Sequence, residues 1–167
     1  FRRQKKRIYK KEFNFFEQLF LNQIPYCIFI SKENFINYGI YDENMKLGYE
    51  DWDLNIKLGK NNIFGKRLPI PIFHYDVQDS GMLLSKSIKN HITIWKSIKA
   101  KNRSIYKIDF LLSQWFLWRR KSSFYPLTIY FVWYLILNIM PEYFSLKLFL
   151  ALRKINVLLK RTIFKTN

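Results

Sequence analysis

Three carboxylates and a tryptophan are crowded into residues 48–54, whose sequence is Gly-Tyr-Glu-Asp-Trp-Asp-Leu. The chain is otherwise strongly basic, with 29 Lys and Arg against 12 Asp and Glu, yet three of the acids fall within four consecutive positions: Glu50, Asp51 and Asp53. A carboxylate held against a substrate hydroxyl can remove its proton, and such a base contributes on the order of 10² to 10⁴ in rate. Candidate chemistry therefore begins at this acidic cluster.

The same acids also have a structural interpretation. Carboxylates are favoured in the first turn of a helix, because they face unpaired amides and the positive end of the helix dipole. A helix of about ten residues is predicted from Asp51 to near Gly59, since Leu54 and Leu58 lie four apart and glycine commonly ends a helix. Helix capping explains one or two of the acids and leaves a third unexplained.

The segments around the cluster predict how it is held. Residues 24–31 are short, apolar and bounded by Pro25 and a polar cluster, which predicts a buried strand followed by a turn or helix start. Residues 35–45 include Gly39 in a loop-like passage. Residues 63–75 carry two prolines, a pattern typical of an extended edge element.

Taken in order, residues 28–35, 38–43 and 48–54, followed by His74, resemble the acceptor-side half of inverting family-two nucleotide-sugar glycosyltransferases. In that family a loop of the type Gly-Gly-Phe-Asp-Glu precedes a segment of the type Gly-x-Glu-Asp-x-Asp-Leu, and a histidine often follows. The resemblance covers roughly residues 24–82. It implies an α/β fold, namely the acceptor-side part of the Rossmann-like GT-A fold.

The resemblance also implies a role for each matched residue. Asp51 would be the general base that deprotonates the acceptor hydroxyl, and Glu50 would orient the acceptor or support that base. Trp52 and Tyr49 would line the acceptor pocket, although Trp52 could instead fill the core. His74 would help to ligate a divalent metal, Mn or Mg, on the donor diphosphate; a lone histidine between two aromatic residues is also commonly structural.

No part of the chain matches the upstream half of such an enzyme, which supplies the nucleotide-binding strands and an Asp-x-Asp metal motif. The chain has five glycines and no glycine-rich run that could cradle a phosphate. The metal is therefore expected mainly through that other half. As a fragment, the chain is expected to be inactive on its own.

The composition changes after residue 80, which predicts a division into an acceptor-side part, residues 1–82, and a helical part, residues 83–167. Helices are predicted around the apolar stripe of residues 84–95, over residues 105–120, and as a basic amphipathic helix over residues 143–164. Between Lys121 and Glu142 lie 20 residues without a formal charge. That length is close to the roughly 20 residues that span a bilayer, so a spanning, an interfacial and a buried helix are all considered. Basic residues on both sides favour a helix lying on the membrane surface.

The net charge of +17 indicates a polyanionic partner: nucleic acid, an anionic lipid surface or a phosphate-bearing substrate. Nucleic acid is not favoured, because the aromatic residues gather in the least charged segment and no zinc-ligand spacing occurs. The lone cysteine, Cys27, allows no internal disulfide and indicates a reducing compartment. The expected partners are thus a nucleotide-sugar donor and a glycan or lipid-linked acceptor, with the protein peripheral at the cytoplasmic face of the plasma membrane. The alternative is a non-catalytic, basic membrane-associated scaffold.

Overall fold

The computed structural model describes residues 12–24, 27–68, 70, 86–121 and 125–163. Within them the chain forms seven α-helices and one 3₁₀ turn. In order these are α1 (Phe15–Gln18), α2 (Lys32–Tyr38), α3 (Glu50–Lys60), α4 (His91–Lys101), η2 (Arg103–Tyr106), α5 (Ile108–Trp118), α6 (Leu127–Ile139) and α7 (Glu142–Ile163).

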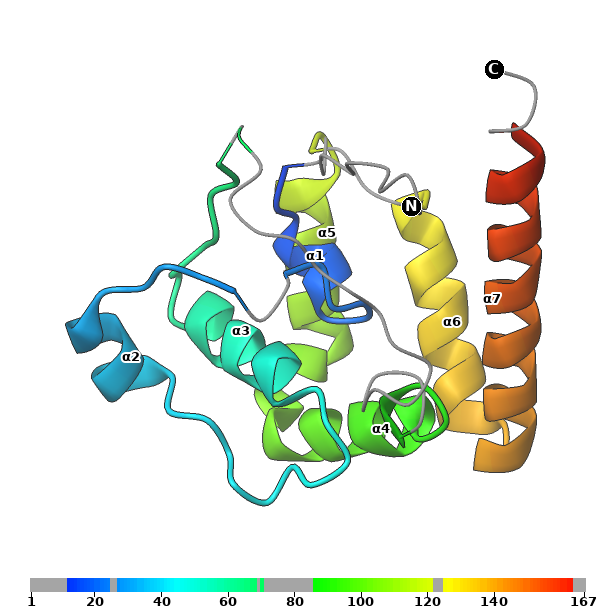
Figure 1. The fold of residues 1–167 in the computed structure, drawn as a ribbon, viewed down its shortest axis with the longest axis horizontal. Coiled ribbons are helices and arrows are strands. Elements are labelled where there is room, and N and C mark those ends of the chain that lie inside the picture. Colours follow the sequence, from blue (N-terminus) through cyan, green and yellow to red (C-terminus); the bar gives the residue numbers. More distant parts are fainter. Residues whose placement is uncertain (1–11, 25–26, 69, 71–85, 122–124, 164–167) are drawn as a thin grey trace, which may run out of the picture.

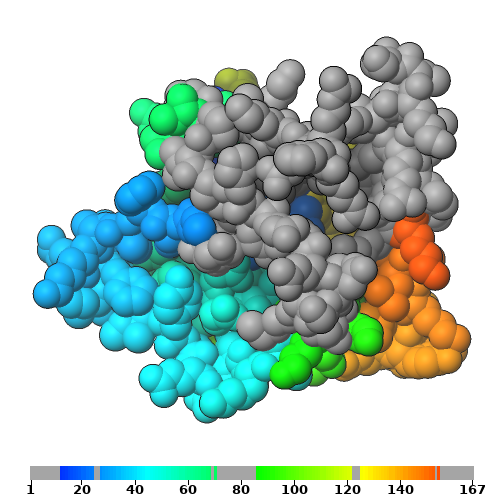
Figure 2. Space-filling view, in the orientation of Figure 1, coloured from blue at the N-terminus to red at the C-terminus, as the bar shows by residue number. Residues whose placement is uncertain are grey.

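The short helix α1 lies at the centre of the molecule (Figure 1). It contacts α3 and α5, while α4 contacts α7, and α6 runs beside α7 at one edge (Figure 1). Helix α2 and the loop that follows it stand at the opposite edge, where they form a projecting lobe in the space-filling view (Figure 2).

The predicted α/β fold is wrong for the part of the chain that the structure describes, which contains helices and no strand. Residues 27–31, predicted as a buried strand, have no regular structure, and Phe29 among them is 87% exposed. Residues 63–68 are likewise irregular. Strands persist only where their backbone groups are paired with a neighbouring strand, and these two segments have no such neighbour among the described residues.

The helical predictions fare better. The helix expected from Asp51 to near Gly59 runs from Glu50 to Lys60, and the one expected over residues 143–164 runs from Glu142 to Ile163. The segment 105–120 divides into η2 and α5. The polar residues after residue 30 do start a helix, since the hydroxyl of Ser31 accepts a hydrogen bond from the backbone N–H of Asn34 at 3.2 Å. The predicted domain division falls among residues outside the description and stays a prediction.

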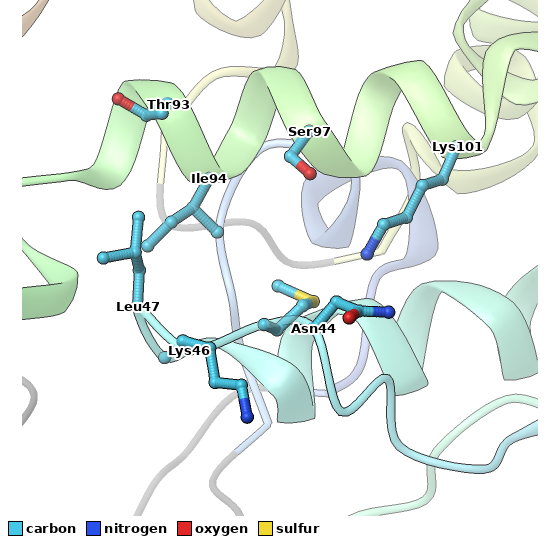
Figure 3. A pocket seen from close by; sticks show the side chains of 9 residues that line it. Asn44, Lys46, Leu47, Thr93, Ile94, Ser97 and Lys101 are labelled. Carbon is cyan, nitrogen blue, oxygen red and sulfur yellow. The ribbon is translucent and has the colours of Figure 1, made fainter.

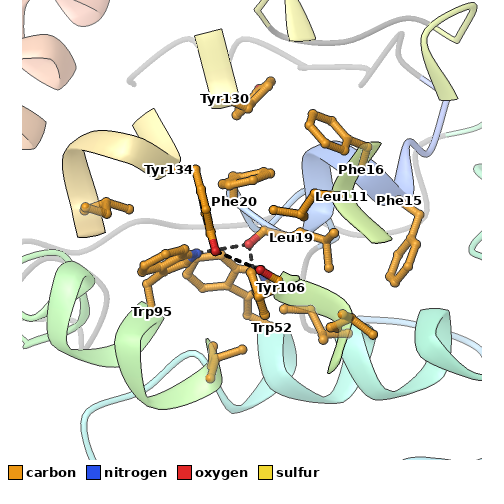
Figure 4. Packing of buried hydrophobic residues seen from close by; sticks show 14 of the residues in the cluster. Phe15, Phe16, Leu19, Phe20, Trp52, Trp95, Tyr106, Leu111, Tyr130 and Tyr134 are labelled. Atoms are coloured by element: carbon orange, nitrogen blue, oxygen red, sulfur yellow. Dashed lines mark hydrogen bonds between the residues drawn. The ribbon is translucent and has the colours of Figure 1, made fainter. Parts of the chain in front are cut away.

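Buried hydrogen bonds tie α3, α4 and η2 to the end of α1 and tie α6 to η2; Figure 4 shows those that join Leu19, Trp95, Tyr106 and Tyr134. The carbonyl oxygen of Leu19 accepts from the indole of Trp95 at 3.1 Å and from the hydroxyl of Tyr106 at 2.8 Å. The carbonyl of Gln18 accepts from the indole of Trp52 at 2.7 Å. Helix α6 joins through the hydroxyl of Tyr134, which donates to the carbonyl of Tyr106 at 2.7 Å.

These bonds answer a problem of local structure. The last carbonyls of any α-helix have no partner within the helix, and an unpaired carbonyl is costly once it is buried. At the end of α1, these carbonyls accept hydrogen bonds from aromatic side chains of α3, α4 and η2, whose rings are themselves buried in the core. We refer to this arrangement as the α1 hub.

No helix among the described residues has both the length and the apolar character needed to cross a bilayer. The uncharged segment that prompted the membrane prediction contains α6, which has 13 residues. Its Leu127, Tyr130, Tyr134 and Leu137 are buried in the core.

Removing one donor of the α1 hub should destabilise the fold measurably. Tyr106→Phe deletes a buried hydrogen bond while Trp95 still satisfies the Leu19 carbonyl, so we expect a loss of about 1 kcal/mol in the free energy of unfolding. Urea denaturation measures it. Tyr143→Phe is the matched control, because Tyr143 is 61% exposed; equal stability of the two variants would argue against the hub.

Gly59 is predicted to tolerate no side chain. A Cβ built there would lie 2.1 Å from Cε2 of Phe15, whose ring is buried, whereas a Cβ at Gly65 would meet nothing closer than 3.4 Å. Gly59→Ala should therefore cost about 1–3 kcal/mol through overpacking, and more than the helix propensity of alanine returns. Thermal or urea unfolding of Gly59→Ala beside Gly65→Ala checks this, and a stabilised Gly59→Ala would contradict it.

Candidate functional site

The acidic cluster begins where the backbone makes a left-handed turn into α3. Gly48 has φ 96°, and Tyr49, the residue before the helix, has φ 62° and ψ 25°. Glycine adopts this conformation freely, but a tyrosine does so only at an energetic cost. The N-cap residue, Tyr49, makes no capping hydrogen bond with its side chain. Glu50, Asp51 and Asp53 lie within the first turn of the helix. The turn fixes the direction in which α3 presents these acids.

Asp51 is half-buried and its carboxylate is held from two sides. Oδ2 accepts a hydrogen bond from the side-chain amide of Asn22 at 3.0 Å, and Oδ1 accepts from the backbone N–H of Trp52 at 2.8 Å. Each oxygen retains a further lone pair. An oriented, partly accessible carboxylate of this kind can accept a proton from a hydroxyl that approaches it.

Burial sets the protonation behaviour of this carboxyl. It raises the pKa of Asp51 above the ordinary value of 3.8, and the neighbouring negative charge of Glu50 acts in the same direction, although the Asn22 bond opposes both. The pKa of Tyr41 is raised too, by burial first and then by Asp51 and Glu50. The structure thus brings Tyr41, Glu50, Asp51 and Asn22 into one neighbourhood.

Asp53, the third acid, is fully buried and has a structural role. Its Oδ2 pairs with the ammonium of Lys57 at 2.9 Å, one turn further along α3. Lys57 also donates to the backbone carbonyl of Ile40 at 3.1 Å. The Asp53–Lys57 pair therefore fastens the loop before the acidic cluster to α3, and the Asp53 carboxylate itself has no surface for a ligand to reach.

Trp52 is placed in the core and not on an accessible surface. Its side chain has no exposed area, and its indole belongs to the α1 hub. The resemblance implied that Trp52 lines an acceptor pocket, but a ring with no accessible surface cannot stack on a sugar in this structure. Of the two interpretations of Trp52, core filling is the one that its position fits.

A stack of aromatic rings lies beneath the start of α3. The imidazole of His91 lies between Trp52, at 5.4 Å and 15° between the ring planes, and Phe149 of α7, at 4.0 Å and 3°. The half-buried Tyr49 ring meets both Trp52 and His91 edge to face, at 5.5 Å and 5.7 Å. This stack connects α3, α4 and α7 and supports the backbone that carries Glu50 and Asp51.

A shallow pocket opens beside the left-handed turn at Gly48, between residues 44–48 and α4 (Figure 3). Its polar lining comes from Asn44 and Lys46 of the loop and from Thr93, Ser97 and Lys101 of α4. The loop is held in place by an ion pair of Lys101 with Asp42, which lowers the pKa of that carboxyl to about 2. The pocket takes in Gly48 but neither Glu50 nor Asp51.

His74, the predicted metal ligand, lies outside the described residues. Among the residues that are described, no group of three or more His, Cys, Asp or Glu side chains could hold a metal ion. The divalent metal that the resemblance implies stays a prediction, and no step proposed below passes through one.

Sequence reasoning missed Asn22, which orients Asp51 from 29 residues away. No local signal marks it, because the pairing exists only once α1 is packed against α3. Tyr41 lies in a loop that the sequence did single out, but its closeness to Asp51 depends on the turn at Gly48 and Tyr49.

Comparison with known proteins leaves the chain without an assigned relative: no family model, curated protein or solved structure matches it. Any functional conclusion therefore rests on the residues themselves.

The raised pKa of Asp51 predicts a pH-dependent stability. A carboxyl whose pKa is higher folded than unfolded favours the folded state in acid, and that contribution is lost as the pH rises from the unfolded value, about 3.9, through the folded one. Asp51→Asn removes the effect, so its stability relative to the native chain should improve between about pH 4 and pH 7. Urea unfolding across this range measures it.

Asp109→Asn is the matched control, because Asp109 is an exposed aspartate in the first turn of α5. Subtracting its effect isolates what is due to the half-buried setting of Asp51. A constant difference between Asp51→Asn and the native chain over the whole range would contradict the prediction.

Proposed function

We propose that this chain carries the acceptor side of a glycosyl transfer reaction, with Asp51 as the base that activates a sugar hydroxyl. The observation that carries the proposal is the setting of Asp51: half-buried at the start of α3, oriented by Asn22, and with a raised pKa. The resemblance of residues 48–54 to the acceptor segment of inverting nucleotide-sugar transferases supports the same role.

In the proposed reaction the acceptor hydroxyl approaches a free lone pair of the Asp51 carboxylate. The proton passes to Asp51 as the hydroxyl oxygen forms a bond to the anomeric carbon of the donor sugar. The bond from that carbon to the nucleotide diphosphate breaks on the opposite side, so the configuration inverts and the diphosphate leaves with the electron pair. A positioned base of this type contributes on the order of 10² to 10⁴ in rate.

The nearby acids are less suited to the task. Asp53 is buried and paired with Lys57, and Asp42 is paired with Lys101, which lowers its pKa to about 2. A carboxylate of low pKa is a weak base, whereas a raised pKa makes the carboxylate of Asp51 a stronger base. Glu50, half-buried beside Asp51, is the residue proposed to orient the acceptor.

In this proposal the nucleotide-sugar donor is bound by a separate nucleotide-binding half, because no part of this chain matches that half. The proposed contribution of this chain is therefore one wall of the reaction centre. Tyr49 stays a proposed acceptor contact, since it is half-buried at the turn, while Trp52 is proposed only as its support.

The competing function is a non-catalytic scaffold in which the acids only stabilise the start of α3. It is favoured by one observation, that the polar pocket beside the turn does not include Asp51. The two functions differ in what the loss of one carboxylate does to the product.

Replacing Asp51 by Asn in the complete protein should lower sugar transfer by about 10²- to 10⁴-fold, because the base is lost while the shape is kept. The assay follows radiolabelled sugar from uridine, guanosine and thymidine diphosphate sugars into glycolipid and polysaccharide of membranes from the producing cells. Asp109→Asn should transfer at the native rate. Unchanged transfer by Asp51→Asn would leave the scaffold as the better explanation.

A further inference from the structure

Helix α6 presents a stripe of large apolar side chains to the outside. Ile129, Val132, Leu135 and Ile139 are 48%, 57%, 52% and 79% exposed, and we call these four residues the α6 stripe. Their spacing of three, three and four residues places them along one side of the helix. The opposite side carries Leu127, Tyr130, Tyr134 and Leu137, which are buried in the core.

Helix α6 has a well-packed core side as well, so a lack of core contacts does not explain the α6 stripe. The buried side is fixed by specific contacts: Tyr134 donates to the carbonyl of Tyr106 at 2.7 Å, and Tyr130 donates to the buried carboxylate of Glu17. Helix α6 therefore cannot rotate to hide its outer residues. Contiguous exposed apolar side chains of this kind mark an interaction surface.

Cations flank α6 on both sides in the sequence, while α6 itself has no charged residue. Arg119, Arg120 and Lys121, all exposed, precede it, and Lys147 follows it with its ammonium over the exposed Tyr143 ring at 4.3 Å. The nearest acid in sequence, Glu142, is paired with Lys96 at 3.5 Å and accepts from Thr93. An uncharged helix with an exposed apolar side, flanked in the sequence by cations, complements an anionic lipid surface.

We propose that the α6 stripe docks this protein onto the surface of an anionic bilayer, with α6 lying parallel to the membrane. A helix of 13 residues is about 20 Å long, too short to cross the roughly 30 Å hydrocarbon layer but suited to lying at its boundary. A second copy of the chain is the less favoured occupant, because the net charge of +17 on each copy opposes face-to-face association. This inference goes beyond the proposed transfer reaction and does not depend on Asp51.

The test is co-flotation of the full chain with vesicles of phosphatidylcholine and phosphatidylglycerol, compared with vesicles of phosphatidylcholine alone. The variant Val132→Gln/Ile139→Gln makes the stripe polar without touching the buried side of α6. The matched control is Ile36→Gln/Ile40→Gln. It introduces the same polar residue at Ile36 in α2, which is 52% exposed, and at Ile40 just after α2, which is 59% exposed. Circular dichroism confirms that each variant is folded.

We expect the native chain and the control to float with the anionic vesicles, and the stripe variant to partition at least about tenfold more weakly, since apolar burial is lost. Part of the native binding should survive a change from about 0.1 M to about 1 M salt, which shortens the Debye length from roughly 10 Å to roughly 3 Å.

Three results would overturn the proposal. The first is equal flotation of the stripe variant and the native chain. The second is complete loss of native binding at high salt, which would mean that charge alone attracts the lipid. The third is a native dimer in sedimentation equilibrium that the stripe variant converts to a monomer, which would assign the stripe to self-association.

Discussion

The structure depends on how the last carbonyl groups of α1 are satisfied. A helix of four residues cannot pair its own C-terminal carbonyls, and here they are buried. Three aromatic donors from α3, α4 and η2 converge on the carbonyls of Gln18 and Leu19. Because each donor also buries a large ring, hydrogen bonding and apolar burial reinforce one another, and the relative placement of these elements is fixed at one point.

The candidate site follows from the same constraint. The indole of Trp52 is held by the Gln18 carbonyl, so the first turn of α3 is anchored to α1 through the residue next to Asp51. The same packing brings Asn22, just beyond α1, to the carboxylate of Asp51. The orientation of the proposed base is therefore a consequence of core packing. A substitution in the α1 hub is therefore expected to change the orientation of the Asp51 carboxylate as well.

The sequence predicted elements whose information is local and failed where pairing was required. Helix α3 was predicted to within one or two residues, because the spacing of Leu54 and Leu58 and the acids in its first turn are properties of a single segment. The strand expected over residues 24–31 was wrong: an apolar run has strand propensity, but a strand exists only with a partner. Residues 27–31 instead form an irregular, partly exposed passage.

By itself the sequence determined the scarcity and clustering of acid, the first turn in which Glu50 and Asp51 sit, and the uncharged character of α6. These depend on composition and on the helical period alone. Only the tertiary structure decided that Trp52 is core while Asp51 remains partly accessible, that Asn22 orients the base, and which side of α6 stays exposed. Neighbouring residues on a helix point about 100° apart, so the packing of α3 against α1 determines which of them is buried.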